Sequence, residues 1–184
     1  MKRILLIIAA LAVGVTASAQ RWSLSTNAID YMNFATLNLE GSAAVSQHIS
    51  LYAGGRYNPW TLNEGQENQK QNRQRTMYLG FRYWPWHIYS GWWLGAKGQY
   101  QEYNHGGIIK QETEEGDAYG AGVGAGYTLM LSDHWNVEFG GYLWGGRKQP
   151  YTVYACPKCG RIVETGNKTF LAPDDVILSL VYVF

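Results

Sequence analysis

The sequence is poor in cysteine, in net charge and in long apolar segments. Its 184 residues contain two cysteines, and 15 lysines and arginines stand against 14 aspartates and glutamates. This balance, without a basic stripe interleaved with aromatic residues, argues against nucleic acid as a partner. No second long apolar segment follows the N-terminal one, so no further stretch approaches the roughly 20 residues of a membrane-spanning helix.

The N-terminal segment has the features of a secretory signal peptide. Met1-Lys2-Arg3 is a short basic start, residues 4–15 are apolar, and Ala17-Ser18-Ala19 is a small-residue cleavage site. No cysteine follows the site to accept a lipid. We therefore expect cleavage after Ala19, with residues 1–19 as the signal peptide and residues 20–184 as one domain.

Glycine and aromatic residues are abundant, with 22 Gly, 14 Tyr, 8 Trp and 5 Phe. This composition favours strands over helices, and an alternation of period two runs through most of the chain. The pattern predicts an all-β protein of eight antiparallel strands. Their apolar faces begin at Trp22, Leu37, Ile49, Met77, Trp92, Tyr119, Trp135 and Val176.

The connections between these strands alternate in length. Short turns are predicted at residues 46–48, 85–91 and 132–134, and long polar loops at 61–74, 104–116 and 147–173. A short first hairpin at residues 31–35 departs from this order. Short turns at one end and long loops at the other are typical of an outer-membrane up-and-down β-barrel, with the periplasm on the short side.

A soluble eight-stranded barrel that carries a ligand would show the same alternation with its faces reversed. Strand length and the placement of aromatic residues favour the membrane. The alternating last strand resembles the signature that outer-membrane barrels present to their assembly machinery. We therefore expect a transmembrane barrel in contact with outer-membrane lipids. The expected aromatic rims are Trp22, Trp135, Tyr182 and Phe184 near the short turns, and Tyr57, Trp60, Tyr100, Tyr103 and Tyr119 near the long loops.

The opposite, polar face would then line the lumen, where it carries charges of both signs. Eight strands enclose a space that side chains just about fill, so we interpret these residues as a network of paired charges and not as a conducting pathway. Buried charges are tolerated when each has a partner. The network comprises Glu40, Arg56, Arg82, Lys97 and Glu138.

The motifs that could carry chemistry are few. Cys156 and Cys159 form one Cys-x-x-Cys, which we interpret as a local disulfide; half of a metal site is the alternative. Lipid-modifying enzymes occur on small barrels, but His105 is the only histidine predicted near the outer side, in a loop and facing solvent. We therefore predict no catalytic residue and no cofactor.

Several of these segments together resemble the domain of unknown function 3575 family. They are Thr26-Asn27, the aromatic and glycine-rich middle, the Cys-x-x-Cys loop, and Phe170 to Asp174 leading into residues 177–182. The resemblance implies a small outer-membrane barrel of Bacteroidota, with the paired cysteines as a recurrent loop feature, and it implies no activity. We expect a non-enzymatic role in envelope structure, adhesion or contact with a protein partner. The alternatives are a lipid-modifying enzyme and a soluble ligand carrier.

Overall fold

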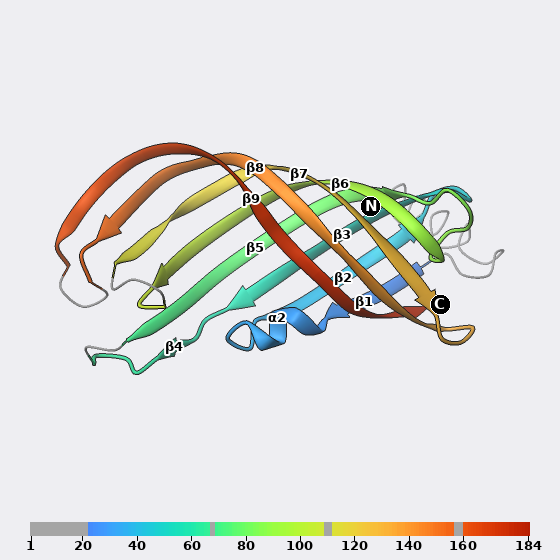
Figure 1. Ribbon diagram of the computed structural model, residues 1–184, viewed down its shortest axis with the longest axis horizontal. Coiled ribbons are helices and arrows are strands. Elements are labelled where there is room, and N and C mark those ends of the chain that lie inside the picture. The colour runs from blue at the N-terminus through green and yellow to red at the C-terminus, as the bar shows by residue number, and fades with distance from the viewer. Residues whose placement is uncertain (1–21, 67–68, 109–111, 157–159) are drawn as a thin grey trace, which may run out of the picture.

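The computed structural model describes residues 22–66, 69–108, 112–156 and 160–184, which form a single antiparallel sheet of nine strands (Figure 1). The all-β antiparallel prediction is confirmed. The elements are β1 (Trp22–Asn27), α2 (Ala28–Met32), β2 (Leu37–Ala44), β3 (Ile49–Asn58), β4 (Thr61–Leu62), β5 (Lys70–Tyr83), β6 (Gly91–Gly106), β7 (Thr113–Met130), β8 (Trp135–Tyr154) and β9 (Ile162–Val183).

The sheet closes on itself. The strands pair in the order β3-β2-β1-β9-β8-β7-β6-β5, and β3 also pairs with β5, so these strands form a complete ring. The two-residue β4 pairs with β5 outside this ring. Within the ring both edges of each strand are paired, but in the described part of the chain β9 before Ser179 pairs only with β8. This part of β9 therefore keeps one free strand edge, of the kind that can pair with another chain.

A single turn of helix, α2, connects β1 to β2, where the sequence predicted a short hairpin at residues 31–35. The Asn27 side chain caps it by accepting a hydrogen bond from the Ile29 amide at 3.2 Å. Phe34 and Ala35 then take positive φ angles, and this left-handed step returns the chain to β2. Within the described ranges, no helix is long and apolar enough to span a membrane.

The ring buries its polar face and exposes its apolar face. On β5 the outward Met77 and Leu79 are 64% and 70% exposed, whereas the inward Thr76 and Arg82 are 1% and 5% exposed. The same alternation continues around the ring, because successive side chains of a strand point to opposite faces. The exterior is therefore apolar, and the interior holds charged and polar side chains together with a cluster of buried hydrophobic ones such as Trp84 and Trp93.

The strands are very unequal in length, and here the sequence prediction was wrong. β1 has 6 residues and β9 has 22, and much of the three predicted polar loops belongs to β5 through β9. Figure 1 shows β6 to β9 arching well beyond the ends of β1 and β2. Both faces of these extensions carry polar residues, so they lack the alternation that reveals a half-buried strand.

The opposite end of the ring has tight turns. The Val45 amide donates to the Ile49 carbonyl and the Leu131 amide to the Trp135 carbonyl, each at 2.9 Å. Inside this end, the indole of Trp84 is almost completely buried and donates a 3.0 Å hydrogen bond to Ser50 Oγ. The short-turn end is thus closed by packed side chains.

Candidate functional site

The interior of the ring contains two groups of ion pairs. In the first, Arg82 on β5 contacts Glu40 on β2 at 2.6 Å and Glu138 on β8 at 3.4 Å. All three side chains are largely buried. One guanidinium thus bridges two carboxylates on opposite sides of the ring, and its planar shape suits such a double contact.

The second group joins Arg56 and Lys97 to acidic residues that the sequence prediction did not include. Lys97 Nζ lies 2.6 Å from Asp174 and 3.1 Å from Asp175, and Arg56 contacts both aspartates. Arg56 Nε also lies 3.2 Å from Asp30 of α2. All five residues of the predicted charge network therefore lie inside the ring, but three of their partners were missed.

The sequence did not predict the roles of Asp174 and Asp175 for a local reason. The register between β8 and β9 shifts at this point, because Tyr142 pairs with Asp175 while Leu143 pairs with Pro173. Asp174 is the extra residue of this β-bulge, and both aspartates are buried in the interior. A proline followed by two adjacent aspartates resembles a loop in sequence, and alternation does not predict that both carboxylates face inward.

Aromatic rings pack between the two groups of charges. The guanidinium of Arg82 lies 4.3 Å from the Tyr52 ring centre and 4.8 Å from that of Trp93, and Lys97 Nζ lies 4.7 Å from the Tyr142 ring. These are cation–π distances. The Tyr52 hydroxyl donates to the Tyr142 hydroxyl at 2.9 Å. The cations are thus held by rings as well as by carboxylates.

The glycine-rich inner face of β7 makes room for these rings. A Cβ on Gly124 would lie 2.6 Å from the Tyr142 ring, and one on Gly126 would lie 2.4 Å from the Trp93 ring. A hollow in the interior between Asp30, Arg82 and Asp175 measures only about 20 Å³. This volume holds about one water molecule. Side chains therefore fill the ring at this level.

The inner face of the long strands carries a second polar cluster, beyond the closed part of the ring. Glu114 on β7 accepts hydrogen bonds from Lys148 at 2.6 Å and from Tyr103 at 2.7 Å. Burial by itself would raise the pKa of Glu114, but these two hydrogen bonds and the positive charges of Lys148 and Lys168 together outweigh it and hold the pKa below 4.5. Glu114 therefore remains ionised in a partly buried position.

His105 belongs to this cluster and is not the solvent-facing loop residue that the sequence predicted. It lies on β6 with its ring centre 5.2 Å from that of Tyr103. Its Nε2 is buried without a hydrogen-bond partner among the described residues. Burial, with a contribution from the nearby Lys148, lowers its pKa from 6.5 to about 4. Tyr103, predicted on the outer aromatic rim, is likewise buried on the inner face.

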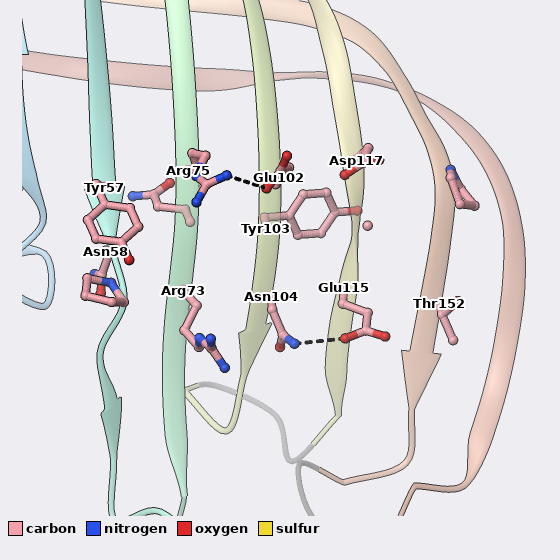
Figure 2. Close-up of a pocket in the computed structure, with 14 residues that line it drawn as sticks. Tyr57, Asn58, Arg73, Arg75, Glu102, Tyr103, Asn104, Glu115, Asp117 and Thr152 are labelled. Carbon is pink, nitrogen blue, oxygen red and sulfur yellow. Dashed lines mark hydrogen bonds and ion pairs between the residues drawn. The ribbon is translucent and has the colours of Figure 1, made fainter.

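The outer face of the same strands is polar and open to solvent. Arg75 lies 3.8 Å from Glu102, and Asn104 donates a 2.9 Å hydrogen bond to Glu115, as the dashed lines in Figure 2 show. Arg75, Glu102 and Asp117 occupy one row across β5, β6 and β7. This row lies directly beyond the apolar exterior and marks its boundary.

Cys156 follows β8 at the far end of the long strands. Cys156 is disulfide-bonded, and Cys159 lies outside the described residues, as do residues 1–21, which include the predicted cleavage site. Within the described residues no group of three or more His, Cys, Asp or Glu side chains could hold a metal ion.

Fold and site together define a β-rich protein whose antiparallel sheet closes around paired charges and turns its apolar side chains outward. The chain belongs to the family described as protein of unknown function (DUF3575), whose model matches residues 5–184. The family resemblance in the sequence is thus confirmed. No curated protein matches the chain.

Proposed function

We propose that the protein is a non-enzymatic outer-membrane β-barrel that holds a rigid surface outside the cell for envelope structure, adhesion or contact with a protein partner. In this arrangement the apolar exterior faces lipid, the tight turns face the periplasm and the long strands project outward. The proposal rests on the burial pattern, in which charged side chains lie inside the ring and apolar side chains lie outside it. A soluble carrier needs an empty apolar interior for its ligand, whereas this interior is filled by ion pairs such as Arg82 with Glu40 and by the aromatic rings that pack against them.

The height of the apolar exterior supports a membrane setting. On β7 the outward residues from Tyr119 to Leu129 are exposed and mostly apolar, and they extend roughly 33 Å along the strand at about 3.3 Å per residue. At a tilt near 45° this length corresponds to an apolar band about 25 Å tall. The next outward residue of β7 is Asp117, where such a band would end.

Aromatic side chains lie at both limits of this band. Trp22, Trp92 and Trp135 are exposed near the tight turns, and Tyr57, Tyr100 and Tyr119 are exposed near the charged row. Two such girdles are typical of membrane interfaces. The position of Tyr103 on the inner face does not affect this pattern.

The strand extensions support the proposed contact role. Tyr154 donates to Glu115 at 2.6 Å across β7 and β8, and backbone pairing between β8 and β9 continues to Tyr154 and Ile162. A paired sheet presents side chains in fixed positions, which lowers the entropy that a binding surface loses when a partner docks.

The experiment that tests the proposal is gel migration of the protein recovered from the outer-membrane fraction, with and without boiling. A closed membrane barrel stays compact in detergent until it is heated, so we expect a shift on boiling. Recovery from the soluble periplasm without a shift would overturn the proposal. Conductance in a planar bilayer is the second readout, and the filled interior predicts none above background.

A further inference from the structure

The outer face of β2, β3 and β5 contains an apolar groove of about 390 Å³. Outward side chains form its walls, among them Leu37, Leu39 and Met77, each at least half exposed. The groove is hollow because Gly55, which pairs with Leu39, has no side chain to fill it. A second apolar groove of about 630 Å³ lies further toward the turns on the same strands.

A polar hollow of about 500 Å³ adjoins the first groove on the side of the strand extensions. The two share Tyr57 and Arg75, which therefore stand at the boundary between apolar and polar surroundings. Figure 2 shows this hollow, with Tyr57 on β3 beside Arg73 and Arg75 on β5. The two hollows together would fit an amphiphilic molecule, with its apolar part in the groove and its polar part in the polar hollow.

The charge nearest to the groove is positive. Arg73 is exposed and has no ion-pair partner in the described part of the chain. Among the residues that the structure describes, Arg75 forms one ion pair, with Glu102 at 3.8 Å, and both side chains are about half exposed. An exposed contact at this distance is weak, so both guanidinium groups are available to an anion. The carboxylates of Glu102, Glu115 and Asp117 line the same polar hollow, from β6 and β7, on the side away from the apolar groove.

We propose that this face binds one anionic lipid of the outer leaflet, with an acyl chain in the apolar groove and a phosphate on Arg73 and Arg75. The inference rests on the proposed membrane position and adds a specific ligand to it. Arginine matches a phosphate with two parallel hydrogen bonds. A zwitterionic headgroup offers the same phosphate but adds a cation that the two arginines repel, so a lipid with a net negative charge is preferred. The groove then selects a lipid over a free phosphate, because only the lipid also buries apolar surface there.

Native mass spectrometry of the detergent-purified protein tests the inference, using phosphatidylglycerol and phosphatidylcholine with the same acyl chains. We expect the wild type to prefer phosphatidylglycerol by at least tenfold. A basic residue near a membrane surface contributes a factor of about five. Arg73→Gln and Arg75→Gln should therefore each lower phosphatidylglycerol affinity about fivefold, and the double variant should abolish the preference. Glu102→Gln should strengthen phosphatidylglycerol binding.

Two further variants separate the charge from the groove. Arg147→Gln removes an exposed arginine from β8, outside both hollows, and should leave the preference unchanged. Gly55→Leu fills the groove and should weaken both lipids; its new Cβ would meet only the Thr76 carbonyl, at 3.1 Å. Each variant is first shown to keep the migration shift on boiling, so that loss of binding is not loss of folding.

Equal binding of the two lipids by a wild type that shows the boiling shift would overturn the inference while leaving the membrane proposal intact. An Arg147→Gln effect equal to that of the double variant would overturn it too, by showing a general charge effect. Displacement of the lipid by soluble glycerol phosphate at similar concentration would show that the groove has no part in binding. Absence of the boiling shift in the wild type would instead contradict the proposed function.

Discussion

Arg82 Nη1 lies 2.6 Å from Glu40 Oε1, although β5 and β2 are not hydrogen-bonded to each other and β3 runs between them. The contact crosses the interior of the closed sheet. With Glu138 on the other side of the same guanidinium, it links three parts of the ring.

Replacing Arg82 with methionine should destabilise the protein strongly. The change leaves the buried carboxylates of Glu40 and Glu138 without their cation, and breaking one partner of a buried pair costs about 3–5 kcal/mol. Urea unfolding of the protein in lipid vesicles measures this change. Arg147→Met, on the exposed face of β8, is the control and should cost little. Equal midpoints for the two variants would refute the structural role of the Arg82 pairs.

Leu79→Arg should distinguish an exterior that faces lipid from one that faces water. Leu79 is 70% exposed and lies between Met77 and Phe81 on the apolar outer face of β5, so in water the substitution would be nearly neutral. Near the middle of a bilayer it should cost about 2–4 kcal/mol in unfolding free energy. Val163→Arg is the matched control, since Val163 is an exposed apolar residue of the β9 extension, beyond the charged row. If both Leu79→Arg and Val163→Arg left the unfolding free energy unchanged, a membrane position for Leu79 would be contradicted.

Gly124→Ala should disturb the aromatic packing inside the ring. The added Cβ would lie 2.5 Å from the Gly141 carbonyl oxygen and 2.6 Å from the Tyr142 ring, and overpacking of this kind costs about 1–3 kcal/mol. Near-ultraviolet circular dichroism and the urea midpoint report the change. Gly98→Ala, at a position with nothing within 4 Å of the new atom, should leave both unchanged. If Gly124→Ala changed neither the circular dichroism nor the urea midpoint, the ring would have free space that the structure does not show.

The strand extensions should loosen as the pH falls from neutral toward 4. The pKa of His105 is about 4 in the folded protein against 6.5 ordinarily, so the unfolded state takes up its proton first and acid favours opening. The depressed pKa of Glu114 acts in the same direction at lower pH: its stabilising contribution is present above pH 4.5 and is lost as the carboxylate is protonated. Hydrogen exchange of β6 to β9 amides at several pH values measures this effect.

His105→Gln should flatten the pH dependence of exchange between pH 7 and 5. His87, on a tight turn at the other end of the ring, provides the control, and His87→Gln should leave the profile unchanged. An unaltered profile in the His105 variant would assign the acid sensitivity to another group.

The sequence by itself predicted an all-β antiparallel fold and indicated which side chains share a face. Alternation is a local property of a strand, so Met77, Leu79 and Phe81 could be separated from Arg82 by reading along the chain. The charged residues of the polar face could be grouped in the same way, since their spacing assigns Arg56, Lys97 and Glu138 to one side without knowledge of their partners.

Only the tertiary structure decided how those charges pair and where the strands end. Asp174 and Asp175 reach Arg56 and Lys97 because the ring closes and a bulge turns both carboxylates inward. The extensions, with Tyr103 and His105 on their inner face, mix polar and apolar residues on both sides, so no single strand shows a periodic pattern there. They are held by pairing with neighbouring strands, which includes pairs distant in sequence such as Glu114 with Val153.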